Sequence, residues 1–342
     1  MLSNLLILII FNFITYLILY KISFTYNLLD FPNDRKKHIK ATPLIGGLIF
    51  YLSLLFSIYL FEFPEHVNNI IIYSGLIVLT GILDDFYDLK VPTRIILIFI
   101  ACYLLISNGL LLENIGQYNN HIINLGAFGI IFTILSVAGL TNAFNFLDGT
   151  DGLLLSQVII SYLLLFIFCY FNMNDFFLIN FFVVIITLSL LGLFYNFGIL
   201  NKSKIFLGDS GSMFFGFSFG FLLIFITNQE NILFHKILVI WTVAFPIMDF
   251  MSTIFRRMLK RKSPFSPDRT HFHHMLINLN INNFIIIFGT SFLSIILGLS
   301  GYLLTLTFGP LYSLLSFVLI GMVFIYLSIK LEKNLNLGPK IS

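Results

Sequence analysis

The sequence predicts an all-α, polytopic membrane protein, and three observations support this prediction. Of the 342 residues, 58% are hydrophobic and only 10% are charged, whereas roughly a quarter of the residues in a soluble domain are charged. The apolar residues form long continuous runs, which a β-barrel with its short alternating segments would lack. The polar residues gather in short islands between these runs. We therefore treat residues 1–342 as a single membrane-embedded domain.

The apolar runs set the number of expected membrane spans. A spanning helix needs about 20 mostly apolar residues, and by that rule the chain contains about eleven spans. The run from Leu5 to Tyr20 lacks a basic n-region and a small-residue cleavage site, so we expect a retained first helix. The expected spans cover approximately residues 3–22, 43–61, 68–83, 94–112, 121–141, 152–171, 175–195, 211–228, 233–255, 284–306 and 310–330.

The basic residues predict the orientation, because cytoplasmic loops carry an excess of Lys and Arg. The odd-numbered loops and the C-terminal tail hold nearly all of them, and Lys236 is the one basic residue near the even-numbered loops. This distribution places the N-terminus outside and the C-terminus in the cytoplasm. It also places every polar island on the cytoplasmic face.

The first island is Leu83–Asp88, in which Asp84 and Asp85 are adjacent. If the helix continues, Asp84 and Asp88 share one face. Close carboxylates stay ionised when a cation compensates them, and hard oxygen ligands suit Mg²⁺. One of the pair could instead act as a base toward a phosphate acceptor. The alternative is a solvated helix end.

The second island contains Asn142, Asn145, Asp148 and Asp151 at intervals of three residues. On a helix this spacing makes one polar stripe, which could line a site. Alternatively, Asp148 or Asp151 could cap the next helix.

Two further carboxylates stand at or inside spans. Asp209 follows Gly208 at the start of a span rich in Gly and Ser, where phosphates can approach a helix N-terminus and helices can pack closely. We expect Asp209 to be a metal ligand, with a helix cap as the alternative. Asp249 lies inside a span, which suggests a function, although it could simply pair with Arg256 or Arg257.

The last island, Lys260–His274, is basic and carries three histidines. Zinc is disfavoured because no Cys lies nearby. Imidazole can donate hydrogen bonds and Arg suits phosphate, so binding of a diphosphate or a nucleotide is the preferred interpretation. The basic residues could also serve only as an orientation signal.

Four segments in this order, LDDFYDL, NAFNFLDGTDGL, FLGDSGSMFFGF and SPFSPDRTHFHHML, resemble the polyprenyl-phosphate N-acetylhexosamine-1-phosphate transferase superfamily. His271-Phe272-His273-His274 is similar to the branch that makes undecaprenyl-diphospho-N-acetylglucosamine. The peptidoglycan branch instead has three consecutive histidines, and it carries a Lys close after the Asp pair. In this chain the nearest basic residues after that pair are Lys90 and Arg94.

The resemblance implies a reaction at a bacterial plasma membrane. A UDP-N-acetylhexosamine gives its sugar 1-phosphate to undecaprenyl phosphate and releases UMP, with Mg²⁺ or Mn²⁺ as the cofactor. Such a reaction starts O-antigen, teichoic-acid or capsule-type glycan assembly. The sugar is expected to be GlcNAc, and another N-acetylated sugar is an alternative. We expect no nucleic-acid partner, and a homodimer is one possible assembly.

The resemblance also implies roles for individual residues. Asp84 and Asp85 would serve the acceptor phosphate and the metal, and Asp209 would be a further metal ligand. Asp148 and Asp151 would lie in the catalytic centre, with Asn145 near the nucleotide sugar. The donor diphosphate would be bound by a basic set: Arg257, Arg269, His271, His273 and His274.

A function of a different class is a cation-coupled transporter, with Asp249 and the acidic loops as its ion path. Discontinuous helices with carboxylates near mid-span would favour it. Most carboxylates of this chain instead fall at one predicted membrane face.

Overall fold

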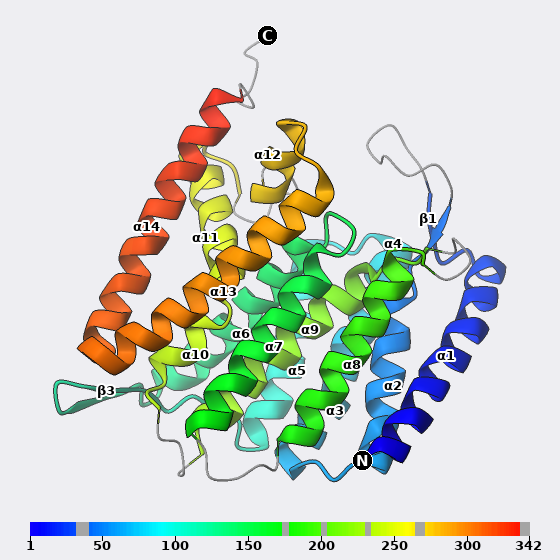
Figure 1. The fold of residues 1–342 in the computed structure, drawn as a ribbon, viewed down its shortest axis with the longest axis horizontal. Helices are drawn as coiled ribbons and strands as arrows, with labels where there is room; N and C mark the ends of the chain where they lie inside the picture. The colour runs from blue at the N-terminus through cyan, green and yellow to red at the C-terminus, as the bar shows by residue number, and fades with distance from the viewer. Residues whose placement is uncertain (32–40, 173–177, 200–203, 230–233, 264–270, 336–342) are drawn as a thin grey trace.

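The computed structural model describes residues 1–31, 41–172, 178–199, 204–229, 234–263 and 271–335. In this part of the chain, helices form one bundle and two pairs of antiparallel strands lie at its ends (Figure 1). The all-α prediction is confirmed. The elements are α1 (Leu2–Thr25), β1 (Leu29–Asp30), β2 (Thr42–Pro43), α2 (Gly46–Leu60), α3 (Glu65–Tyr73), α4 (Gly75–Tyr87), α5 (Val91–Ser107), β3 (Asn114–Tyr118), β4 (His121–Asn124), α6 (Phe128–Leu147), α7 (Leu153–Asn172), α8 (Ile179–Asn196), α9 (Gly208–Thr227), α10 (Ile237–Trp241), α11 (Ala244–Leu259), α12 (Phe272–Asn278), α13 (Asn283–Phe308) and α14 (Pro310–Asn334).

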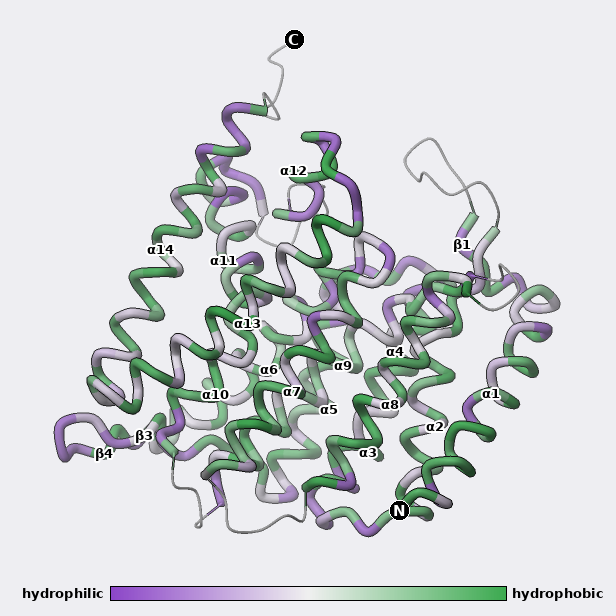
Figure 2. Tube along the Cα trace, in the orientation of Figure 1, coloured by the Kyte–Doolittle hydropathy of each residue, from purple (hydrophilic) through white to green (hydrophobic). Residues whose placement is uncertain are grey.

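Eight helical segments among the described residues are long and apolar enough to cross a membrane, with α3 and α4 counted as one. The helices α2 and α5 are apolar but shorter. Helices suit a bilayer because they satisfy every backbone polar group within the segment. Figure 2 shows hydrophobic residues through the middle of the bundle and hydrophilic residues gathered toward its ends. The molecule is therefore a multi-pass membrane protein, while the count of eleven crossings and their direction stay predictions.

Several expected spans differ from the structure. The span 68–83 is divided at Ser74 into α3 and α4, and the span 94–112 ends with α5 at Ser107. The span 233–255 is split into α10 and α11, because Pro246 has no N–H to donate to the carbonyl of Thr242. The span 121–141 begins seven residues too early, since α6 starts at Phe128 and strand β4 precedes it. Asn119 and Asn120 both have positive φ and form the tight turn between β3 and β4. Asn favours such turns, so this pair was the signal for a hairpin.

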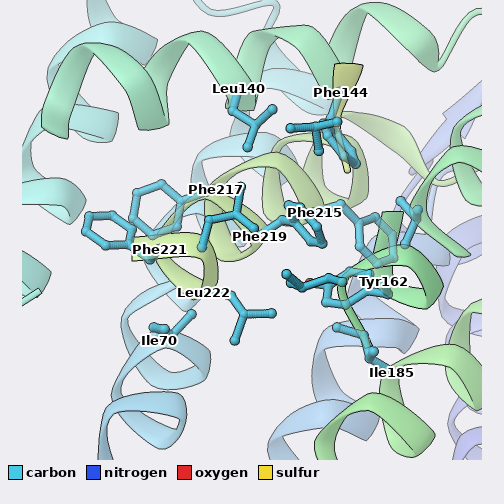
Figure 3. Packing of buried hydrophobic residues seen from close by; sticks show 14 of the residues in the cluster. Ile70, Leu140, Phe144, Tyr162, Ile185, Phe215, Phe217, Phe219, Phe221 and Leu222 are labelled. Carbon is cyan, nitrogen blue, oxygen red and sulfur yellow. The ribbon is translucent and has the colours of Figure 1, made fainter. Parts of the chain in front are cut away.

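Helix α9 is the centre of the bundle, and every residue of its membrane-spanning stretch is buried. Phe217, Phe219 and Phe221 point from α9 into the surrounding core (Figure 3). Glycines let the neighbouring helices approach its backbone, as the composition of this span predicts. A Cβ atom on Gly47 of α2 would lie 2.2 Å from the backbone nitrogen of Gly211, and one on Gly81 of α4 would be as close to that of Ser210. The start of α9 is therefore held rigidly between two other helices.

The start of α9 is also tied to a distant part of the sequence. The Phe206 N–H donates to the Pro43 carbonyl at 2.8 Å, and the Gly46 N–H donates to the Phe206 carbonyl at 2.9 Å. At the level of the whole bundle, α12 and the last turns of α14 lie at the end opposite Met1 (Figure 1). That arrangement agrees with an odd number of crossings.

Candidate active site

The carboxylates of Asp85 and Asp209 meet where α4 ends and α9 begins. The Asp209 N–H donates to Asp85 Oδ1 at 3.1 Å. Gly208 has φ +72°, and a Cβ atom at that position would lie 2.5 Å from Asp85 Oδ2. Both the backbone conformation and the space therefore require glycine before Asp209. The close approach of Gly81 to Ser210 brings α4 and α9 near enough for Asp85 and Asp209 to make this contact.

Helix α6 supplies the amide that fixes Asp209. The Asn145 Nδ2 group donates to Asp209 Oδ1 at 2.7 Å and lies 2.9 Å from Ser212 Oγ. Asn142 instead bonds the Ala138 carbonyl of its own helix at 2.7 Å. The structure thus brings Asn145 to the carboxylates and leaves Asn142 out of that contact.

The adjacent residues Asp84 and Asp85 have different surroundings. Asp84 Oδ1 accepts the Leu89 N–H at 2.7 Å, and Asp84 Oδ2 accepts from Arg94 at 2.6 Å. Asp85 Oδ2 is buried and has no hydrogen-bond partner among the described residues. Asp84 is thus satisfied by the protein, whereas Asp85 keeps one oxygen for a ligand.

The expectation that Asp84 and Asp88 share a helical face is wrong. Helix α4 ends at Tyr87, and Asp88 takes a left-handed conformation with φ 50°. The Asp88 side chain is exposed. The chain turns here because Asp tolerates the left-handed region better than most residues.

Asp148 and Asp151 lie beyond the end of α6, so the predicted four-residue stripe on one helix is wrong after Leu147. They still belong to the site. The pKa of the Asp148 carboxyl is raised to about 8, mainly by burial and in addition by the negative charges of Asp209 and Asp151. Asp151 pairs with Lys204, and its backbone carbonyl accepts from Asn283 at 3.1 Å.

The histidine segment, residues His271 to His274, packs against the end of α6 and the turn that follows it. His273 is 1% exposed, and neither ring nitrogen has a hydrogen-bond partner among the described residues. A Cβ atom on Gly149 would lie 2.2 Å from His273 Nε2, so glycine is needed for the ring to fit. The ring centroids of His273 and His274 are 4.1 Å apart, and those of His273 and His271 are 6.0 Å apart.

Burial holds the pKa of His273 well below its usual range, and the neighbouring His274 and His271 add to this effect. Its imidazole is therefore neutral near neutral pH, with one nitrogen that donates and one that accepts. Buried polar atoms in native proteins normally have partners. The two bare nitrogens of His273 therefore indicate a place for a polar ligand.

Phe146 links the carboxylate side to the basic side. Its ring centroid lies 4.4 Å from that of His271, and the Arg257 guanidinium lies over the ring at 5.1 Å. Arg257 itself is buried. Arg269, the fifth member of the predicted donor-binding set, lies outside the described residues.

Three residues of this neighbourhood were not expected as members of the site. Lys204 was counted only as an orientation signal, although its place five residues before Asp209 was a usable clue. Phe146 gave no signal, because the chain contains 42 Phe residues. Arg94 was noted only for its spacing from the Asp pair, and its ion pair with Asp84 comes from the packing of α5 on α4.

The oxygen ligands present could suit a hard divalent cation only with help from a substrate. Within the described ranges, no group of three or more His, Cys, Asp or Glu side chains is arranged to hold a metal ion. Asp85 and Asp209 form a carboxylate pair, and Asp85 Oδ2 is an orphaned oxygen at that point. Mg²⁺ usually takes one or two carboxylates and completes its shell with water and phosphate oxygens, so this pair fits it.

A large apolar cavity of about 500 Å³ lies between α6, α9, α10, α11 and α14, mostly toward the end of α9 that is away from Asp209. Phe250 lines it, and the Phe250 ring centroid lies 5.6 Å from that of Phe146. Lys236 lines it as well, at the start of α10. The cavity is therefore linked to the site through the contact between Phe250 and Phe146, and it extends from there toward Lys236.

Comparison with known proteins identifies relatives of the chain. A model of the glycosyl transferase family 4 matches residues 67–227, which include the three acidic islands. The undecaprenyl-phosphate alpha-N-acetylglucosaminyl 1-phosphate transferase of Salmonella typhimurium is 30% identical over 280 residues, or 81% of this chain and 76% of the relative. The transferase of the same name from Yersinia pestis is 29% identical over 310 residues, which is 88% of this chain and 84% of the relative.

A relative from Bacillus subtilis, a probable undecaprenyl-phosphate N-acetylglucosaminyl 1-phosphate transferase, is 27% identical over 266 residues. That match covers 77% of this chain and 73% of the relative. The matches extend over most of the bundle, and the range matched by the family model contains Asp85, Asp148 and Asp209. This chain belongs to glycosyl transferase family 4.

Proposed function

We propose that this protein transfers GlcNAc 1-phosphate from UDP-GlcNAc to undecaprenyl phosphate and releases UMP. The observation that carries the proposal is two sets of buried polar atoms without hydrogen-bond partners among the described residues: Asp85 Oδ2 beside Asp209, and both ring nitrogens of His273 against Gly149, next to Asp148. Two anionic substrates need such a divided site, with carboxylates for a cation and basic groups for a diphosphate. The names of the relatives support both the acceptor and the sugar.

Asp209 and Asp85 are proposed to hold Mg²⁺, or Mn²⁺ in its place. When bound, the ion would neutralise phosphate oxygens of the two substrates as they approach, which supplies much of the catalysis in phosphoryl transfer. Asn145 keeps Asp209 oriented through its 2.7 Å hydrogen bond. Asp84 also lies beside Asp209, and Arg94 neutralises it through their ion pair.

The donor diphosphate is proposed to bind the histidine segment, with Arg257 and Arg269 as further cations. His273 would donate from one ring nitrogen, since its lowered pKa keeps the ring neutral before the substrate arrives. In the reaction, an oxygen of the lipid phosphate forms a bond to the phosphorus that carries the sugar. The bond from that phosphorus to the bridging oxygen breaks, and UMP leaves with the electron pair.

Asp148 and Asp151 are proposed to lie beside the reacting phosphates. With a pKa of about 8, the Asp148 carboxyl holds a proton near neutral pH in the absence of other cations. Asp151 is neutralised by Lys204 and so adds little repulsion toward an incoming phosphate. The lipid phosphate is already anionic at neutral pH, so these carboxylates need not remove a proton from it.

The acceptor's isoprenoid chain is proposed to lie in the apolar cavity beside Phe250, with its phosphate at the carboxylates. This arrangement would let a lipid enter from the membrane while UDP-GlcNAc arrives from the cytoplasm. The excess of basic residues in the loops at this end supports a cytoplasmic active site in a bacterial plasma membrane. The product would start a lipid-linked cell-surface glycan.

The test is turnover by the purified protein with UDP-GlcNAc and undecaprenyl phosphate, measured as UMP release with and without EDTA. We expect UMP only when both substrates and a divalent cation are present. Asp209→Asn should abolish the release, and Asp88→Asn should not, because Asp88 is exposed and its left-handed conformation suits Asn. Absence of metal-dependent UMP from any UDP-N-acetylhexosamine would refute the proposal.

A further inference from the structure

Asp249 has a role that the proposed reaction does not use. Its carboxylate is 1% exposed on α11, and Oδ1 accepts the N–H of Phe272, the first residue of α12, at 3.0 Å. One hydrogen bond from a buried side chain thus anchors the backbone from which the histidines project. Helix α12 has only seven residues, so it depends on such anchors for its position.

The second oxygen of Asp249 faces His271. Asp249 Oδ2 lies 3.9 Å from His271 Nδ1, is buried, and has no hydrogen-bond partner among the described residues. Thr253, one turn further along α11, has its Oγ1 3.2 Å from the same nitrogen. Arg256 donates to Thr253 Oγ1 at 2.8 Å and fixes that hydroxyl. One face of α11 therefore holds the Nδ1 edge of His271.

The other side of His271 faces the site, where its ring lies against Phe146. The ring of His271 is parallel to that of His273, with an interplanar angle of 6°. An imidazole with Nδ1 hydrogen-bonded to Thr253 and a carboxylate 3.9 Å from the same nitrogen is fixed in orientation at its other nitrogen. Asp249 thereby orients the two histidines from the α11 side, and in the proposed site it does not contact a substrate itself.

A merely structural acceptor for the Phe272 N–H would not need a charge. A buried carboxylate is costly compared with a neutral amide, and Asn could accept the same hydrogen bond. Among the described residues, the basic side chains near Asp249 are Arg256 and Arg257 on its own helix and His271 from the segment before α12. Of these, Arg257 and His271 both belong to the proposed donor-binding set, and His271 is the one whose Nδ1 lies toward Asp249 Oδ2, at 3.9 Å.

We propose that Asp249 is a positioning residue for donor binding, which fixes His271 through its charge and the start of α12 through its hydrogen bond. This inference rests on the proposed function, because it takes the histidine segment as the site of the UDP-GlcNAc diphosphate. The affinity for the donor should then depend on Asp249, and the affinity for the lipid acceptor should not.

Asp249→Asn separates the two contacts, since it keeps an acceptor for the Phe272 N–H and removes the charge. We expect the donor KM to rise by about 10-fold, within the range typical of residues that orient a ligand-binding side chain. The acceptor KM should stay unchanged, and kcat should fall by less. Asp249→Ala removes both contacts and should raise the donor KM further.

The matched control is Glu332→Gln. Glu332 is also a buried carboxylate, paired with Lys260 at 2.8 Å, but it contacts α11 from α14 rather than the histidines. This variant should keep the wild-type donor KM. Thermal unfolding of each variant in detergent separates loss of fold from loss of positioning.

Thr253→Val is a second variant that leaves the Asp249 carboxylate in place. If the Asp249 variants do not fold, this variant tests whether α11 positions His271 for donor binding. It should raise the donor KM less than Asp249→Asn does. Binding of UDP-GlcNAc without acceptor, measured by calorimetry, distinguishes failure of the proposed function from failure of the Asp249 positioning role. If the wild type does not bind UDP-GlcNAc, the proposed function fails. If it does, and folded Asp249→Asn and Thr253→Val keep the wild-type donor KM, the positioning role is overturned.

Discussion

The two sides of the candidate site are held in different ways. On the carboxylate side, Asp85 and Asp209 stand at the ends of α4 and α9, whose backbones touch at Gly81 and Ser210. On the histidine side, His273 belongs to the short helix α12 and His271 immediately precedes it, and both are tied to α11 by side chains, with Asp249 at the centre. The first side is fixed by backbone packing in the core, and the second by one hydrogen-bonded network. The comparison suggests that the carboxylates set the rate of the reaction and the histidines set the affinity for the donor.

The largest effect should come from Asp85→Asn. The change removes the negative charge of Asp85, whose Oδ2 is buried and has no hydrogen-bond partner among the described residues, and so weakens the proposed cation site. We expect kcat to fall by more than about 100-fold, beyond the 10- to 100-fold typical of outer-shell partners of a metal. UMP release at saturating substrates measures it, and Asp88→Asn in the same island serves as the control. Equal activity of the two variants would contradict the separate role of Asp85.

His273→Asn should act mainly on the donor. Loss of a hydrogen bond to a charged phosphate costs about 1.5–3 kcal/mol, which corresponds to a roughly 10- to 100-fold rise in the donor KM. The acceptor KM should change little. His121→Asn, an exposed substitution on β4, is the matched control. A fall in kcat with an unchanged donor KM would place His273 on the rate-setting side and break the comparison.

Gly81→Ala tests whether backbone packing fixes the carboxylate side. The new methyl group would lie 2.2 Å from the backbone of Ser210, so α4 and α9 must separate. Overpacking of this kind costs about 1–3 kcal/mol in the free energy of unfolding. The midpoint of thermal unfolding in detergent should fall and kcat should fall with it, while the donor KM is spared. Gly289→Ala on α13, where a Cβ atom meets nothing within 4 Å, should leave both unchanged.

The smallest expected effect is the release of protons when Mg²⁺ binds, and it is expected from the carboxylate side alone. The pKa of Asp148 is about 8 in the folded protein against an ordinary value of 3.8, so its ionised form is disfavoured by folding. Its contribution to stability is therefore lost as the pH rises from about 4 through 8, unless a cation compensates. Mg²⁺ binding should release a proton below pH 8 and release less above it. Calorimetry in buffers of different ionisation enthalpy measures this, and proton uptake instead would contradict the assignment.

Much of the fold followed from the sequence, because lipid imposes simple rules on length and composition. The long runs predicted the helices, and the Gly and Ser of residues 208–220 predicted the close packing of α9. The errors lie where short polar signals compete with hydropathy. Pro246 splits one helix, and Asn119-Asn120 turns the chain into a hairpin just before another.

The site was predicted less completely, because residues of the same type have different partners in the folded chain. Asp84 and Asp85 look alike in the sequence, yet Arg94 from α5 occupies the first and nothing in the described chain occupies one oxygen of the second. Asp249 could not be assigned between an ion pair with Arg256 and a functional contact. The structure shows that it bonds the Phe272 N–H and faces His271.

The sequence by itself determined that this protein lies in a membrane, that its carboxylates and histidines are spaced as in one family, and that they fall between apolar runs. Those properties depend on composition and order along the chain. Only the tertiary structure decided which carboxylate oxygens stay bare, that Phe146 joins the two sides, and that α11 holds the histidines from behind. These depend on contacts between helices far apart in sequence, such as the approach of Gly81 to Ser210, which no local pattern encodes.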